Sequence, residues 1–179
     1  MYNLNQEQSS VVEKIRPNDA DFIVNSSGFY QATINSDNRP CIHFRNGPKG
    51  FLQVLGERKI AFADYHDLNH QGFDSKDRSS DQISLILMDY AQRRQLKIKG
   101  QFSHWSVNQQ DLSLFKLTAP RTGKRLRGII VINVDKLEWR ACLDIPVRLS
   151  LEELDPQIYK IREELVRLRV ENAKLRALS

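Results

Sequence analysis

Apolar and polar residues alternate with a period of two along much of the chain before Pro146, and this alternation predicts β-strands. Between residues 21 and 56 the predicted strands are FIVNSS, FYQATIN, CIHFR and FLQVLG, separated by the turn SDNRP and the glycine-containing break NGPKG. KIAFADY follows, with Ile60 and Phe62 expected to face inward and Lys59 and Ala61 outward. The segments QISLILMDY, QLKIKGQFSHWSV and RGIIVINVDKLEW complete a set of short strands, which is typical of a barrel or a sandwich.

Few segments of this β-rich body carry helical signals. Val11, Val12 and Ile15 have roughly helical spacing, and Pro17 is expected to end that helix. DLSLFKLT is predicted to be a second short helix. The polar segment that follows KIAFADY, up to Asp81, is predicted to be a loop whose length suggests a function.

After Pro146 the period of two gives way to a heptad repeat. The apolar positions alternate in steps of four and three, which is a coiled-coil pattern: Ile158, Leu165 and Asn172 at a, and Leu154, Ile161, Leu168 and Leu175 at d. We therefore divide the chain into a body, 1–150, and a C-terminal helix, 151–179.

The charges beside the heptad stripe favour a parallel homodimer. Pairing with a second copy places Glu164 opposite Arg169 and Glu171 opposite Arg176, and both pairs attract. Asn172 at an a position favours two strands in register, because its amide can bond to its twin. The alternative is an amphipathic helix that packs on its own barrel.

Composition narrows the class of protein. A chain of 179 residues suits one domain with an extension. Cys41 and Cys142 match neither a zinc motif nor a redox pair, and the four histidines lie in different contexts, so we predict no metal site. The net charge of +5 is compatible with an anionic partner. Without an aromatic stacking platform or a reading helix in the sequence, nucleic acid is not the expected partner.

The N-terminal sequence lacks the charged and then apolar run of a signal peptide. No apolar stretch approaches the roughly 20 residues needed to span a bilayer. We therefore expect a cytoplasmic protein.

Three segments of the sequence resemble one known family. RPCIHFRNGPKGFLQVLGERKIAFADY, LILMDYAQRRQLKIKG and the late ENAKLR are similar to the pyridoxamine 5′-phosphate oxidase-like FMN-binding proteins, in particular a branch with an RGGPPGF-like motif. The resemblance covers the chain from about Asp21 onward. It implies a mainly β, six-stranded antiparallel split barrel that dimerises and holds FMN at the interface, with residues from both subunits.

The resemblance also implies which residues contact FMN, whose doubly charged phosphate, polar chain and flat ring need cations, amides and an apolar slot. They are Arg45, Phe51, Ala63, Asp64, Asn69, His70, Gln71, Gln95, Lys97, Trp139 and Arg148. Arg45 suits the phosphate or the ring edge, because a guanidinium grips oxygens with two donors, and an ordinary ion pair is its alternative role. Alternation puts Gln95 and Lys97 on one face of a strand, where they either approach the flavin or are merely solvated.

The chain departs from the family pattern at two points. Where relatives have a GNRQ stretch that helps to hold the phosphate, this chain has His70 in place of the arginine, a weaker and pH-dependent phosphate ligand. Near the C-terminus, Arg148, Leu149 and Ser150 stand where true oxidases of pyridoxamine phosphate carry an RLH triplet. Vitamin B6 oxidation is therefore not expected, and no catalytic residue can be assigned.

Three functions remain open on this reading. The first is an FMN-dependent oxidoreductase that transfers a hydride or electrons. The second is a non-catalytic binder of flavin or another cofactor. The third is a degenerate member that acts as a dimeric interaction protein.

Overall fold

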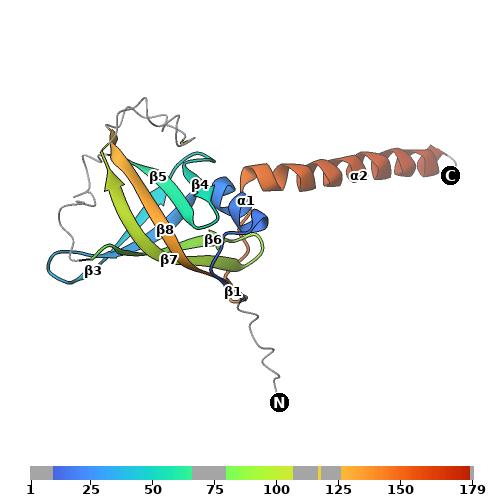
Figure 1. The fold of residues 1–179 in the computed structure, drawn as a ribbon. Helices are drawn as coiled ribbons and strands as arrows, with labels where there is room; N and C mark the ends of the chain where they lie inside the picture. Colours follow the sequence, from blue (N-terminus) through green and yellow to red (C-terminus); the bar gives the residue numbers. More distant parts are fainter. Residues whose placement is uncertain (1–9, 66–79, 107–116, 118–125, 178–179) are drawn as a thin grey trace, which may run out of the picture.

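The computed structural model describes residues 10–65, 80–106, 117 and 126–177, which form one curved sheet and two helices (Figure 1). The helices are α1 (Pro17–Asn25) and α2 (Leu151–Ala177). The strands are β1 (Ser10–Val12), β2 (Gly28–Ile34), β3 (Pro40–Asn46), β4 (Leu52–Gly56), β5 (Lys59–Tyr65), β6 (Gln82–Asp89), β7 (Arg94–Trp105) and β8 (Leu126–Ala141). The predicted short helix DLSLFKLT lies outside the described residues except for Leu117, and most of the predicted loop after β5 lies outside them too.

The strands pair antiparallel in the order β3-β2-β6-β7-β8-β5-β4, and β1 adds to β8. This sheet confirms the predicted mainly β split-barrel class. It contains eight strands among the described residues, two more than the resemblance implied. β1 and β4, of three and five residues, are the shortest of them.

The sheet curls until its two ends meet. Phe29 of β2 packs edge-on against Phe62 of β5, with ring centroids 5.2 Å apart, although three strands, β6, β7 and β8, lie between β2 and β5 in the sheet. Arg45 of β3 reaches Asp64 of β5 at 3.3 Å. The two ends therefore approach through side chains and not through a backbone ladder, which leaves the barrel split. We call this contact line the seam.

Alternating positions of the strands fill the barrel with apolar side chains. Ile130, Ile132 and Val134 are buried there, as the alternation predicted. The outward expectation for Ala61 is wrong, because Ala61 is fully buried in a second cluster on the opposite face of β5 and β8. Its partners in that cluster are Leu117, Ile129 and Val131.

α1 occupies the sequence where a strand was predicted. Residues 10–12 form β1, and Pro17 begins the helix that we expected it to end. The first turn of a helix tolerates proline, because its missing N–H needs no partner there. The backbone N–H of Arg16 donates to Asp19 Oδ2 at 3.0 Å and fixes the start of the helix. The segment FIVN then turns Ile23 fully into the core.

The break NGPKG is the turn between β3 and β4, as predicted, and it is tied to α1. The N–H of Gly47 donates to the Ser27 carbonyl at 3.1 Å, and the N–H of Gly50 donates to the Val24 carbonyl at 2.8 Å. Gly50 has φ 87°, a conformation that favours glycine. A Cβ on Gly47 would lie 2.6 Å from Phe51, so glycine lets the chain pass that ring closely.

α2 is a single helix of 27 residues that points away from the barrel (Figure 1). Its heptad side chains Ile161, Leu165 and Leu168 are exposed. From Ile161 onward the stripe is therefore not packed on the described part of the barrel, which was the alternative to pairing. Neither described helix combines the length and the apolarity that crossing a membrane requires.

Candidate cofactor-binding site

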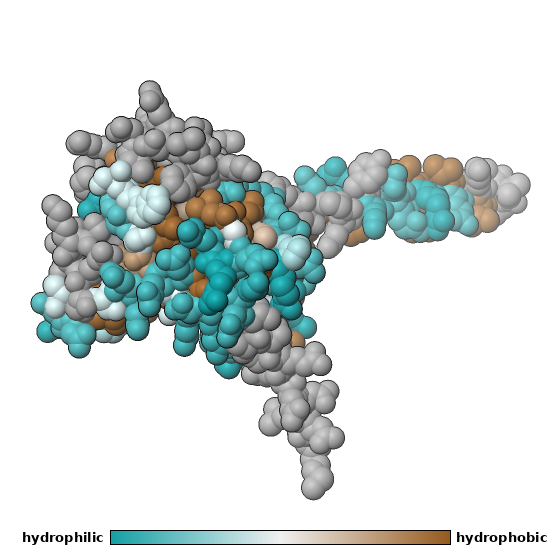
Figure 2. Space-filling view, in the orientation of Figure 1, coloured by the Kyte–Doolittle hydropathy of each residue, from teal (hydrophilic) through white to brown (hydrophobic). Residues whose placement is uncertain are grey.

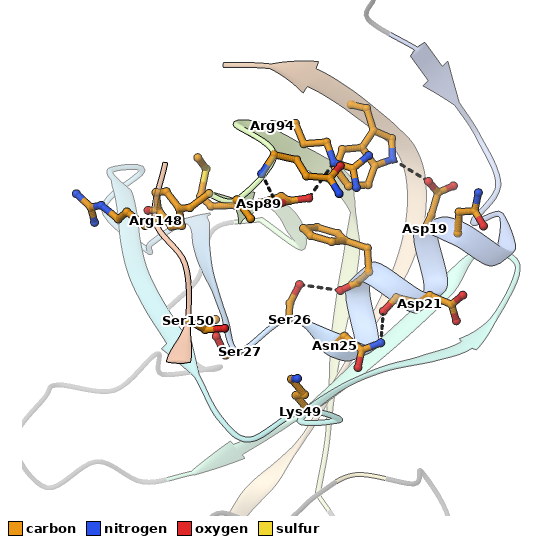
Figure 3. Close-up of a pocket in the computed structure, with 18 of the residues that line it drawn as sticks. Asp19, Asp21, Asn25, Ser26, Ser27, Lys49, Asp89, Arg94, Arg148 and Ser150 are labelled. Carbon is orange, nitrogen blue, oxygen red and sulfur yellow. Dashed lines mark hydrogen bonds and ion pairs between the residues drawn. The ribbon is translucent and has the colours of Figure 1, made fainter. Parts of the chain in front are cut away.

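A groove of about 2180 Å³ runs round one end of the sheet. It is lined by α1, the β3–β4 turn, the β6–β7 turn, the end of β8 and residues 148–150. Figure 3 shows Arg148 and Ser150 on one side of it, Asp19 and Asn25 of α1 on the other, and Lys49 below. Because the groove passes the strand ends, it contacts both faces of the sheet.

The inner wall of the groove is built around Trp139. The indole Nε1–H donates to Asp19 Oδ1 at 2.7 Å, and the ring lies 4.8 Å from that of Phe22. Arg94 places its guanidinium 4.5 Å from the centre of the same ring and pairs with Asp89 at 2.9 Å. The wall is therefore aromatic, with an arginine stacked on it.

Asp19 is 2% exposed and remains an anion in this wall. Burial opposes its ionisation, but hydrogen bonds from Arg16 and Trp139 outweigh burial and lower the pKa of the carboxyl. A fixed negative charge therefore orients the indole from behind.

The outer wall carries the exposed aromatic rings of Tyr30 and Phe44, whose centroids are 5.0 Å apart. These side chains are 42% and 58% exposed, and Ile42 beside them is 71% exposed. Gly28 makes the arrangement possible, because a Cβ there would lie 2.7 Å from the Phe44 ring. Arg148 lies over the ring of Tyr90 at 5.2 Å.

Cross-strand register extends this wall over the outer face of the sheet. Phe44 pairs with Tyr30, Tyr30 with Ile86, and Ile86 with Lys97, so these four side chains form one row on one face. In the next row Gln95 lies between Met88 and Arg140. We call Tyr30, Phe44 and Ile86, with Gln95 and Lys97 at their border, the platform. The platform adjoins the groove, which Tyr30, Phe44, Met88 and Arg140 also line.

A second polar cluster lies at the seam. Arg45 donates through Nη1 to Asp64 Oδ1 at 3.3 Å and through Nε to Gln31 Oε1 at 3.2 Å. Asp64 is 2% exposed at its side chain, and Arg45 20%. Burial raises the pKa of Asp64, although Arg45 and Arg127 nearby oppose the shift. Burial likewise lowers the pKa of the Arg45 guanidinium.

Further polar groups surround that ion pair without completing it. His104 Nε2 lies 3.9 Å from Asp64 Oδ2, and Arg127 Nε lies 4.0 Å from the same oxygen. Asp64 Oδ2, His104 Nε2 and the amide nitrogen of Gln31 are buried without a hydrogen bond. The seam is thus an incompletely satisfied buried cluster, which is costly to maintain.

The structure distributes the predicted contact residues over several places. Trp139 and Arg148 share the groove, and Gln95 and Lys97 share one face, as predicted, beside it. Arg45 and Asp64 form the seam. Phe51 is a core residue stacked on Phe29 at 5.6 Å, and Ala63 packs at the edge of the second apolar cluster. The remaining three, Asn69, His70 and Gln71, lie outside the described residues.

Sequence reasoning missed several side chains that shape the groove and the seam. They are Asp19, Tyr30, Tyr90, Arg94, Gln31, His104 and Arg127. Tyr30 could have been predicted, because it is an aromatic residue at a solvent-facing position of a strand, between the buried Phe29 and Gln31. Asp19 could also have been predicted, because an acid three residues after the residue preceding a helix often caps it.

No protein-family model matches the sequence, and no curated protein matches it. Solved structures do match. A proposed pyridoxamine 5′-phosphate oxidase from Lactobacillus delbrueckii superposes with a TM-score of 0.50 at 16% identity, over 70% of this chain and 94% of that one. A conserved protein of unknown function from Corynebacterium diphtheriae gives 0.51 at 12% identity, over 75% and 98%.

The FAD-binding protein from Mycobacterium smegmatis is a more distant match, with a TM-score of 0.46 at 12% identity, over 71% of this chain and 96% of that one. The match to the Lactobacillus protein confirms the split-barrel fold of the pyridoxamine 5′-phosphate oxidase type. At identities this low the likeness establishes the fold, and a ligand has to be argued from this chain's own residues.

Proposed function

We propose that this protein is a flavoprotein that binds FMN across the platform and the groove and acts as an oxidoreductase. The observation that carries the proposal is the apposition of the Tyr30–Phe44 ring pair with Lys97 and Arg148 on a split barrel. Exposed aromatic surface on this scale is unusual for a sheet face that stays in water. A flat apolar ligand with an anionic end is the kind of molecule that would cover it.

The residues fit the chemical parts of FMN. Tyr30, Phe44 and Ile86 offer an apolar surface for the ring, and Gln95 offers an amide for its polar edge. Lys97, Lys49 and Arg148 are cations for the phosphate at the border of that surface. Bound flavin would supply the hydride or electron transfer, while these side chains bind it, orient it and exclude water.

Two copies of the chain would share the site. Trp139 faces the side of the sheet that Leu96 and Ile98 face, whereas Gln95 and Lys97 face the other side. The groove is also larger than the roughly 300–1,000 Å³ of a usual small-molecule pocket. A second copy laid against the platform would fill the excess volume, cover Ile42 and enclose the ring.

Absorbance and titration test the proposal directly. Purified full-length protein is expected to be yellow, with flavin absorption near roughly 450 nm, or to quench the fluorescence of added FMN with saturation at one equivalent per chain. Protein that is colourless and leaves added FMN fluorescent would contradict it.

A matched pair of variants locates the site. Lys97 and Lys99 lie on the same face of β7, one row apart, but only Lys97 flanks Ile86. Lys97→Met is expected to weaken FMN binding about tenfold through loss of a charged contact. Lys99→Met should leave the dissociation constant within about twofold, and equal effects of the two changes would remove the platform from the site.

A second function is favoured by one observation at the seam. The Arg45 guanidinium already donates to Asp64 and Gln31, so a phosphate would have to share it with a buried carboxylate. This arrangement supports a non-catalytic binder that has the same fold but lacks the phosphate contact of Arg45. Flavin that binds but is not reduced by NADH or NADPH, and is not reoxidised by a coupled acceptor, would favour that function.

A further inference from the structure

α2 presents an apolar stripe that nothing in the described part of the chain covers. Ile161, Leu165, Leu168 and Leu175 are 66%, 46%, 47% and 61% exposed. Figure 2 shows apolar side chains along α2 between hydrophilic ones, on a helix that extends away from the barrel. A stripe of this length in water indicates a missing partner.

The period of the stripe identifies the partner as another helix. The apolar positions recur every 3.5 residues, whereas a helix packed on a sheet needs a broader stripe with a period of 3.6. Val166 and Val170 are also exposed, but they lie outside the heptad stripe, at b and f positions. The heptad residues therefore form a narrow line suited to knobs-into-holes packing.

The charges beside the stripe identify that helix as a parallel second copy. The charged g positions carry only glutamate, Glu164 and Glu171, and the three e positions after the first heptad carry arginine, Arg162, Arg169 and Arg176. A parallel pair sets g against e, which is attractive, whereas an antiparallel pair of identical helices sets g against g and e against e, which is repulsive. Asn172 at an a position meets its own copy only when the pair is parallel and in register.

We propose that α2 forms a parallel, in-register, two-stranded coiled coil with α2 of a second copy of this chain. The helix begins directly at the groove, because the Ser150 carbonyl accepts the N–H of Leu154 at 3.0 Å and Arg148–Ser150 line the groove. Pairing of α2 therefore brings the two grooves to the same end of the helix pair, beside its two-fold axis. The proposal does not depend on the identity of any cofactor.

Disulfide trapping in the full-length protein tests the pairing and its direction. Asn172→Cys is expected to form a covalent dimer under mild oxidation, because equivalent a positions face each other in a parallel pair. Val170→Cys, two residues away on the outer surface, is the control and should cross-link at least tenfold more slowly. The wild type controls for Cys41 and Cys142. Equal rates for both variants, or no dimer from Asn172→Cys, would overturn the proposal.

Charge reversal separates pairing with a second copy from every intrachain arrangement. Arg169→Glu is expected to raise the dimer dissociation constant at least threefold, and adding Glu164→Arg should restore it. Residues five apart on one helix do not contact each other, so restoration cannot arise within a single chain. A double variant that is no better than the single one would overturn the parallel register, whether or not the protein binds flavin.

Discussion

The side chains of two carboxylates, Asp64 at the seam and Asp19 at the groove, are each 2% exposed, yet their pKa values shift in opposite directions. Asp19 accepts hydrogen bonds at 3.0, 3.0 and 2.7 Å from Arg16 and Trp139, and its pKa falls. Asp64 accepts one at 3.3 Å, with the side chains of His104 and Arg127 at 3.9 and 4.0 Å, and its pKa rises. The number and length of the hydrogen bonds, and not burial alone, decide whether the pKa of a buried acid falls or rises.

The seam and the groove also differ in their expected roles, because the seam closes the barrel whereas the groove is open to a ligand. The seam joins the two ends of the sheet with charges that are already paired, so its first role is to close the barrel. The groove keeps Trp139, Tyr30 and Arg148 near open space, so its rings and cations are available to a ligand. Changes at the seam should therefore act mainly on stability, and changes to the groove's exposed cations mainly on binding.

The largest effect is expected from Asp64→Ala. The change leaves the half-buried Arg45 without its carboxylate, and breaking a buried pair in this way costs about 3–5 kcal/mol. Urea denaturation measures the loss. The double variant Arg45→Met with Asp64→Leu removes both charges and should recover most of it. A loss below about 1 kcal/mol for Asp64→Ala would show that the seam does not hold the barrel together.

The groove wall should show a smaller stability effect. Trp139→Phe keeps a ring against Phe22 but removes the donor to Asp19, which costs about 1–3 kcal/mol. Trp105→Phe is the control, because Trp105 is 49% exposed and donates to the nearby Ser103, and its effect should stay within about 0.5 kcal/mol. Equal losses in the two variants would mean that the Asp19–Trp139 bond does not stabilise the wall.

Binding should respond at the groove without a matching loss of stability. Arg148→Ala is expected to weaken FMN binding about tenfold, or about 1.4 kcal/mol, with little change in the urea midpoint. Arg39→Ala, in the exposed β2–β3 turn, serves as the control. The Arg45→Met, Asp64→Leu protein tests the predicted phosphate contact of Arg45 in a stable background. FMN affinity like that of the wild type in this protein would remove Arg45 from the site.

Asp19 and Asp64 should change the stability of the protein in opposite directions as pH falls. The lowered pKa of Asp19 gives stability above its unfolded pKa of about 3.8, and that contribution is lost as pH falls through the folded value. The raised pKa of Asp64 works the other way, because its contribution is present below about 3.8 and is lost as pH rises through the folded value. Between pH 6 and 3, Asp19→Asn should therefore lose less stability than the wild type, and Asp64→Asn more. Parallel curves for the two variants would refute the contrast.

Local sequence patterns predicted most of the strands and the heptad helix. Alternation placed β6, β7 and β8 correctly, because each has a buried face and an opposite face that is mostly less buried. Alternation failed at FIVN, whose four residues suit a strand or a helix equally. The prediction that Pro17 ends a helix was also wrong, because proline can begin a helix as well as end one. Alternation also failed at Ala61, because β5 is covered on both faces.

The candidate site was less accessible from sequence because non-local contacts build it. The platform row depends on the register of four strands, and the Arg45–Asp64 pair depends on how far the sheet curls. Trp139 and Arg148 were predicted through the family resemblance, and the structure brings both to the groove. Their neighbours Asp19 and Tyr90 belong to segments whose approach no local pattern encodes.

Sedimentation velocity recorded at the flavin absorption, near roughly 450 nm, tests the central claim most directly, because it reports cofactor and assembly together. With one equivalent of FMN added, the account predicts that the flavin signal sediments as a particle of twice the chain mass of 20.8 kDa. Flavin that remains unsedimented, or that moves with single chains, would contradict a site shared by two copies.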